Sequence, residues 1–165
     1  MIEKKGNGKM NREIKFRGRR LDNKEWVHGY FYNMPIRNIV ASFILTNDFL
    51  EEFKDGTRDY ELGFHLWKDL FPVDKNTIGQ FTGLYDKKGT PIYEGDIVDA
   101  WSARHHITCG VIRYVPPRFL IGLYDEKRKE FNGSWYLSPN AFGKDELLEV
   151  IGNIHDNPEL LNGTS

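Results

Sequence analysis

The sequence predicts a mainly β protein of short antiparallel strands, arranged as a small SH3-like barrel or a sandwich, with loop insertions and at most short helices. Aromatic and β-branched residues, which favour strands, dominate from Asn11 onward. Glycine, aspartate and asparagine recur about every 8–12 residues, a spacing typical of turns between short strands. We expect the polar segment 1–9 to be a flexible leader and residues 10–165 to form a single β-rich domain.

A hairpin is predicted near the N-terminus. Apolar and basic side chains alternate over residues 14–17, and a turn-like tetrad at 21–24 leads into an aromatic segment. Val27 and Phe31 of this segment share one face of the predicted strand. The opposite face carries four aromatic rings, those of Trp26, His28, Tyr30 and Tyr32. A third strand, or strand pair, is expected between Ile36 and Thr46.

Turn residues divide the middle of the chain. Residues 48–61 hold six acids and two basic residues, which predicts a solvated acidic excursion. Strand-like sequence resumes at 64–73 and 77–83, with turns at Pro72 and 74–76. The run from Asp86 to Gly89 predicts a hairpin, because Gly89 can adopt the left-handed conformation that closes a type I turn with a bulge.

The C-terminal half continues the strand pattern. Gly95 and Asp96 predict a sharp turn before a strand in which Ile97 and Val98 pack on both sides. We expect Asp96 to hydrogen-bond backbone amides of this turn. Further elements are predicted as strands at 107–115, 119–124, 134–137 and 147–154, a charged loop at 125–133, and one helical turn begun by Pro158.

Three segments share the order and spacing of one known family. The first is Thr77 to Val98, with its glycine-rich turns. The second is residues 14–17 followed by Trp26-Val27-His28-Gly29-Tyr30. The third is Val150 to Leu161, which contains Ile151-Gly152-Asn153-Ile154-His155-Asp156-Asn157-Pro158. On these residues the chain resembles the YopX family of phage and prophage proteins. The resemblance implies a phage or prophage origin and a largely β structure. It implies no catalytic residues, because the family has no established biochemical function.

Composition and motifs exclude several function classes. The formal net charge of -1 gives no global basic field for nucleic acid. Cys109 is the sole cysteine, and the longest apolar run is far shorter than the roughly 20 residues needed to span a bilayer, so we expect a cytoplasmic protein without membrane contact. Nucleotide-binding and hydrolase motifs are absent. His105, His106 and Cys109 form an incomplete ligand set, so we predict no metal and no cofactor.

Basic residues are unevenly distributed and suggest one candidate site. Five cations against Glu13 give the first strand region a local charge of +4, and residues 101–118 contain no acid. Arginines among aromatic rings can bind single-stranded nucleic acid by charge attraction and base stacking. The candidate nucleic-acid-binding residues are Arg17, Arg19, Trp101, Arg104 and Arg113. In the alternative interpretation, acidic segments such as 48–61 and the C-terminal acids neutralise this surface in space.

Three functional hypotheses follow. Four Trp, eight Tyr and eleven Phe exceed what one small core hides comfortably, and exposed aromatic residues mark interfaces. We therefore favour a non-enzymatic interaction module that forms a homo-oligomer and contacts a host or phage protein. The alternatives are a nucleic-acid-binding module that uses the arginine and aromatic surface, and a small enzyme whose site the sequence disguises.

Overall fold

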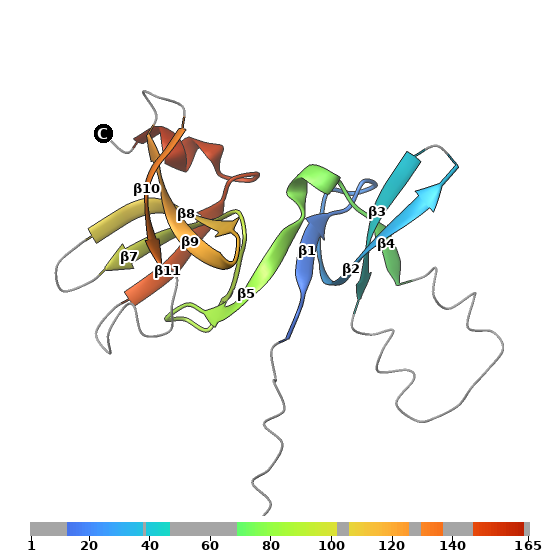
Figure 1. Cartoon of the computed structure of the whole chain (residues 1–165), viewed down its shortest axis with the longest axis horizontal. Helices are drawn as coiled ribbons and strands as arrows, with labels where there is room; N and C mark the ends of the chain where they lie inside the picture. The colour runs from blue at the N-terminus through green and yellow to red at the C-terminus, as the bar shows by residue number, and fades with distance from the viewer. Residues whose placement is uncertain are drawn as a thin grey trace, which may run out of the picture.

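The structure, a computed structural model, describes residues 13–37, 39–46, 69–101, 106–125, 130–136 and 147–163. Within these residues the strands form two antiparallel sheets, ordered β4-β3-β2-β1-β5-β6 and β10-β9-β8-β7-β11. Figure 1 shows the two groups of strands side by side, with β5 running between them. The predicted mainly β class is confirmed. The sheets do not close into a barrel, because each keeps two open outer strands, so the SH3-like barrel is not confirmed.

The first sheet contains the N-terminal strands, and its outer strands are the shortest. Its members are β1 (Phe16–Arg19), β2 (Trp26–Ile36), β3 (Ile39–Thr46), β4 (Leu70–Pro72), β5 (Gly79–Tyr85) and β6 (Pro91–Tyr93). A 3-10 turn, η1 (Lys75–Thr77), precedes β5 and begins at Asp74, whose side chain accepts a hydrogen bond from the Asn76 amide. The predicted first hairpin is confirmed, because β1 pairs antiparallel with β2.

The second sheet contains the C-terminal strands. Its members are β7 (Asp96–Trp101), β8 (His106–Val115), β9 (Arg118–Asp125), β10 (Glu130–Tyr136) and β11 (Leu147–Asn153), followed by the 3-10 segment η2 (Pro158–Gly163). Pro158 begins η2 as predicted. β10 starts at Glu130, so the predicted charged loop at 125–133 ends earlier than expected. The predicted leader at 1–9 and the acidic excursion at 48–61 lie outside the described residues.

One face of the first sheet forms a small core. Val27, Ile44 and Val73 are buried there, and Phe16 and Phe31 pack against them. The alternation predicted for β2 is therefore confirmed on its core side. Gly29 lies on the same strand, where a Cβ atom would approach the Leu45 carbonyl oxygen to 1.9 Å. Only glycine lets β2 and β3 come this close.

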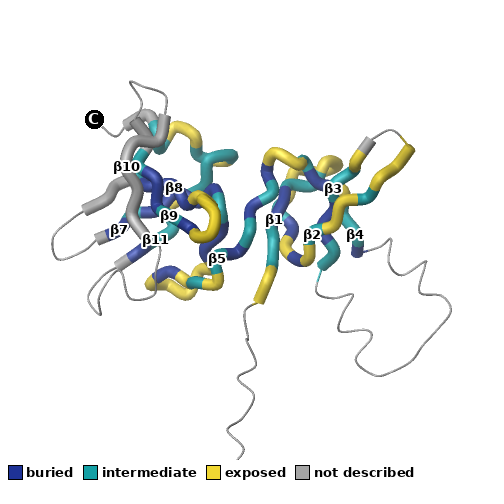
Figure 2. Tube along the Cα trace, viewed as in Figure 1, coloured by how far each residue is buried: buried dark blue, intermediate teal, exposed yellow. Residues whose placement is uncertain are grey.

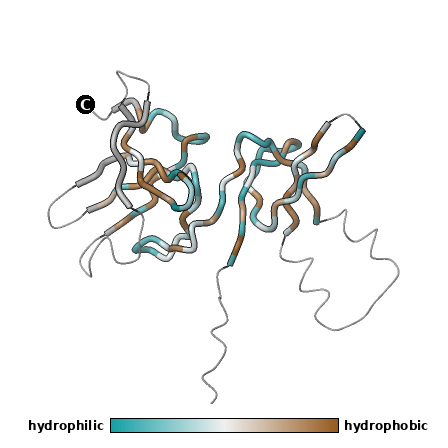
Figure 3. Tube along the Cα trace, in the orientation of Figure 1, coloured by the Kyte–Doolittle hydropathy of each residue, from teal (hydrophilic) through white to brown (hydrophobic). Residues whose placement is uncertain are grey.

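The second core joins residues from both sheets. Val98, Ile112 and Ile121 are fully buried in the second sheet, and Ile92 of β6 packs with them. Leu84 of β5 lies against the same cluster. Figure 2 shows β5 largely buried or half-buried between the two groups of strands, and Figure 3 shows apolar residues concentrated inside each group. The β5-β6 hairpin is therefore hydrogen-bonded into one sheet and packed against the other.

The turn of the β5-β6 hairpin is held by Asp86. Gly89 has a φ of 83°, and its amide donates to the Asp86 carbonyl oxygen, as the predicted turn requires. The Asp86 carboxylate accepts from the amides of Lys88 and Thr90 at 2.8 Å and from Val150 of β11 at 3.2 Å. Burial acts to raise the pKa of Asp86, but these amides outweigh it and lower that pKa. The turn is thus fastened to β11.

A bulge interrupts the regular pairing of β8 with β7. Cys109 has a φ of 56°, and the pairing of β7 with β8 shifts register near this residue. Beyond the bulge Val111 and Ile112 are both buried, whereas Tyr114 and Val115 are exposed. β8 therefore passes beyond the core after Ile112, while Val111 and Val115 keep the regular register with β9.

We expect Gly29→Ala to destabilise the fold by about 3 kcal/mol, the upper range for overpacking a well-packed site, because the methyl group forces β2 and β3 apart. Urea unfolding followed by circular dichroism measures the change. Gly83→Asn is the control, since nothing lies within 4 Å of the added Cβ and asparagine is among the residues that tolerate a positive φ best. Equal stability of the two variants would contradict the close packing at Gly29.

Candidate functional site

A buried ion pair joins the two sheets. Arg17 lies in the centre of β1, and its Nη2 is 2.6 Å from Oδ1 of Asp96, the first residue of β7. Arg17 is 8% exposed and Asp96 is 1% exposed, so water screens this pair little. We call the cluster of Arg17, Trp26, Tyr93, Asp96 and Asp156 the Arg17 junction.

Two aromatic rings flank the guanidinium group of Arg17. Its Cζ lies 4.8 Å from the ring centre of Trp26 and 5.1 Å from that of Tyr93, both within cation–π range. Nη2 also donates to the Glu94 carbonyl oxygen at 3.3 Å. A Cβ atom on the neighbouring Gly79 would meet that carbonyl at 2.4 Å, so glycine is required beside the pair.

Asp96 has the structural role predicted for it. Its Oδ2 accepts a hydrogen bond of 2.7 Å from the Tyr93 amide, which closes the turn before β7. Burial raises the pKa of Asp96, while the charge of Arg17 and the Tyr93 amide act against this rise. Ile97 and Val98, the next two residues, are fully buried on opposite sides of the sheet, as the sequence predicts.

A second contact at the junction involves the turn after β11. Asp156 accepts a hydrogen bond of 2.7 Å from the Trp26 indole Nε1 and forms an ion pair of 2.9 Å with Arg19. His155 lies beside the same indole, with ring centres 5.9 Å apart. Burial acts to raise the pKa of Asp156, but hydrogen bonds from Asn153 and Trp26 and the charge of Arg19 lower it. The carboxylate of Asp156 is therefore held in its ionised form.

The described residues show no arrangement typical of catalysis or metal binding. No group of three His, Cys, Asp or Glu side chains gathers in this part of the chain as metal ligands do. Burial, with the nearby Asp99, raises the pKa of the Cys109 thiol, which disfavours the reactive thiolate. His105 lies outside the described residues. No helix of the described ranges has the length and apolar character needed to cross a membrane.

The candidate nucleic-acid-binding residues occupy different environments. Arg17 is buried and Arg19 is half-buried, and both contact Trp26. Arg113 is exposed on β8 of the other sheet. The backbone of Trp101 ends β7, opposite Leu147, and Arg104 lies outside the described residues. Arg17 thus faces the interior, and nucleic-acid binding by the five candidate residues stays a prediction.

Acidic partners neutralise the basic residues around β1. Four of the five cations in the predicted basic region are described, and each forms an ion pair: Lys15 with Glu13, Arg17 with Asp96, Arg19 with Asp156, and Arg20 with Asp22. The fifth, Arg12, lies outside the described residues. Sequence reasoning foresaw neutralisation but named other acids. Asp96 and Asp156 are far away in the chain, and no local pattern identifies them.

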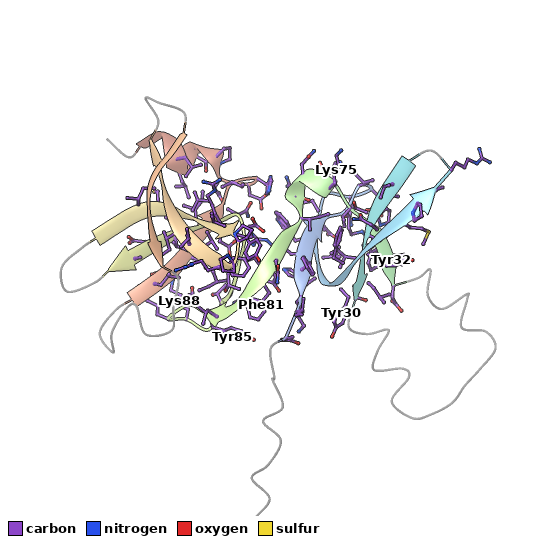
Figure 4. The ribbon with its side chains drawn as sticks, viewed as in Figure 1. Tyr30, Tyr32, Lys75, Phe81, Tyr85 and Lys88 are labelled. Carbon is purple, nitrogen blue, oxygen red and sulfur yellow. The ribbon has the colours of Figure 1, made fainter. Side chains whose placement is uncertain are left out.

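The exposed face of β2 carries an apolar stripe. We define the tyrosine stripe as Tyr30, Tyr32, Met34 and Ile36, which alternate along the strand on the face opposite Phe31. Tyr30 is 38% exposed, Tyr32 54% and Ile36 39%. Figure 4 labels both tyrosines on the first sheet, away from the second. The sequence predicts the alternation of Tyr30 and Tyr32 on one face. It does not predict that β2 extends to Ile36, because Ile36 is expected to begin the next strand.

The fold and these contacts define a two-sheet antiparallel β protein with an internal ion-paired junction. A family model described as YopX protein matches residues 15–162 of the 165-residue chain. The chain belongs to the YopX family. A similar solved structure is the crystal structure of protein EF1440 from Enterococcus faecalis, with 27% identity over 90% of this chain and 98% of that chain and a TM-score of 0.46. No curated protein matches the chain.

We expect Arg17→Met to lower the free energy of unfolding by about 3–5 kcal/mol, because it leaves the buried Asp96 carboxylate without its counter-charge. Adding Asp96→Asn should recover part of this loss, since the amide oxygen can still accept from the Tyr93 N–H. Urea unfolding of the single and double variants measures both effects. Arg20→Met is the control, because the pair of Arg20 with Asp22 is exposed. A loss no larger than that of the control would show that the junction is not structural.

Proposed function

We propose that this protein is a non-enzymatic protein-interaction module of a phage or prophage, acting in the host cytoplasm and associating with a second copy of itself through the tyrosine stripe. The observation that carries the proposal is the run of apolar side chains at alternate positions of β2, in which Tyr30, Tyr32 and Ile36 are exposed and Met34 is half-buried. Contiguous exposed apolar residues are unusual on monomeric proteins and mark interaction surfaces. Tyrosine is also enriched in interfaces, where its ring is buried and its hydroxyl group still finds a partner.

The geometry of the stripe suits pairing between identical copies. A straight row of side chains on one strand can lie against the same row of a second molecule across a two-fold axis. Beside the stripe, on the neighbouring strand β3, Phe43 and Leu45 pair with Tyr32 and Tyr30 in the sheet register. Such cross-strand pairs support a flat apolar surface, because directly opposite residues share one face.

The charges near the stripe favour a neutral partner. Lys15 directly precedes β1, and extending the register of β1 with β2 by one residue places it beside Tyr30. The ammonium group of Lys15 forms an ion pair of 2.6 Å with the Glu13 carboxylate. The neighbouring Arg17 and Arg19 are paired with acids of the C-terminal half. Because these charges cancel within one molecule, they give little attraction for a highly charged partner. A second copy of the same uncharged stripe meets no electrostatic penalty.

Nucleic-acid binding remains the second candidate because of the aromatic face of β2. His28, Tyr30 and Tyr32 are exposed at alternate positions and can act as stacking platforms for unpaired bases. Such binding also needs cations that contact phosphates, and it weakens with salt. The internal pairing of Lys15, Arg17 and Arg19 removes the cations closest to this face, so the protein partner is favoured.

We expect Tyr32→Glu to weaken self-association at least tenfold, because a carboxylate would be buried at the centre of the stripe. Sedimentation equilibrium over a range of protein concentrations measures the dissociation constant. Tyr114→Glu is the matched control, since Tyr114 is a 42% exposed tyrosine of β8 outside the stripe. It should leave association unchanged.

Three outcomes would contradict the proposal. The native chain could be monomeric at every concentration tested, or the two variants could weaken association equally. Fluorescence anisotropy with a labelled single-stranded oligonucleotide at low salt tests the second candidate in parallel. Salt-sensitive binding that Tyr32→Glu abolishes, with no self-association of the native chain, would replace the protein partner by nucleic acid.

A further inference from the structure

The turn that follows β11 contacts the first sheet through the side chains of His155 and Asp156. Asp156 binds both the Trp26 indole and Arg19, and His155 packs beside that indole. The turn is held in shape by Asn153, whose side chain accepts from the amides of His155 and Asp156 at 3.0 Å. His155 and Asp156 are therefore held in one hydrogen-bonded turn that faces Trp26 and Arg19.

The charges that face His155 come from three directions. β1 contributes Arg17 and Arg19, the segment before η1 contributes Asp74, and the turn itself contributes Asp156. Trp26 of β2 supplies an uncharged ring. With His155 neutral, the turn presents one negative charge to Arg19. With His155 protonated, the turn presents no net charge to the two arginines.

The environment of His155 opposes protonation while the turn is docked. Burial lowers the pKa of His155, as do the charges of Arg17 and Arg19, and this outweighs the opposing effect of Asp156 and Asp74. Because the pKa of this histidine is lower when the turn is docked, the docked contact has its full stability at any pH above about 6.5, the ordinary pKa of histidine. That stability is lost as the pH falls below this value, because the undocked state binds the proton more tightly.

We propose that the contact of the His155–Asp156 turn with Trp26 and Arg19 is a proton-operated latch, which protonation of His155 opens. The imidazolium group becomes better hydrated when it moves away from the Trp26 indole. Asp156 separates from Trp26 and Arg19 at the same time, because both residues belong to one turn. Opening uncovers the Trp26 ring and the Arg19 guanidinium group. Both lie on the face of the first sheet that carries the tyrosine stripe. The latch does not require self-association, so either proposal can fail alone.

The indole N–H of Trp26 reports directly on the latch. In the full chain, its two-dimensional nuclear magnetic resonance signal can be identified as the one lost in Trp26→Phe. We expect this signal to shift and to lose protection from solvent exchange as the pH is lowered from 7.5 to 5, with a midpoint below 6.5 that coincides with the titration of the His155 ring.

Two variants separate the latch from other acid effects. His155→Gln should hold the Trp26 signal constant over this range, whereas His28→Gln should keep the native transition, because His28 packs against Tyr93 instead. His155→Phe, which keeps a ring beside the indole, replaces His155→Gln if the amide spectrum shows that the glutamine variant is unfolded. A constant Trp26 signal in the native chain, or the same transition without His155, would overturn the proposal.

Discussion

The buried pair of Arg17 and Asp96 is the interaction on which the arrangement of the two sheets depends. Burying two charges costs more than their attraction returns unless other groups compensate. Here Trp26 and Tyr93 flank the guanidinium group, and the Tyr93 amide binds the free carboxylate oxygen. Gly79 leaves the space that a side chain would fill beside the pair. Together these contacts fix one relative position of β1 and β7, although the Nε of Arg17 is buried without a hydrogen-bond partner.

The β5-β6 hairpin gives the pair a rigid frame. Its first strand is hydrogen-bonded to β1, and Ile92 of its second strand is buried in the core of the other sheet. At its far end Asp86 binds the Val150 amide, and Lys87 and Lys88 both pair with Glu149. The two sheets therefore share a structural element, and the core of the second sheet is incomplete without it. The apolar stripe of β2 is presented by this assembly at a distance from the shared hairpin.

Local signals account for what the sequence could predict. The β2 alternation, the Asp86 to Gly89 hairpin and the turn at Asp96 each depend on residues within a few positions of one another, so pattern and turn chemistry were sufficient. The role of Arg17 was beyond such reasoning, since no periodicity tells which of several neighbouring cations is buried. The contact of Trp26 with Asp156 is equally hidden, because the two residues are far apart in the chain. The bulge at Cys109 lies between the neighbouring strands β7 and β8, and it was missed because a positive φ is uncommon for any residue but glycine.

The separation of these partners along the chain bears on how the protein is made. Trp26 and Asp156 are 130 residues apart, and Arg17 and the Glu94 carbonyl are 77 apart. Contacts between such distant residues slow folding, because a long loop must close before they form. During synthesis the N-terminal strands leave the ribosome well before their C-terminal partners exist. The counter-charge of Arg17 appears with Asp96 at the start of β7, whereas the partner of Trp26, Asp156, follows β11. The first sheet can therefore reach its final packing only after the turn beyond β11 has been translated.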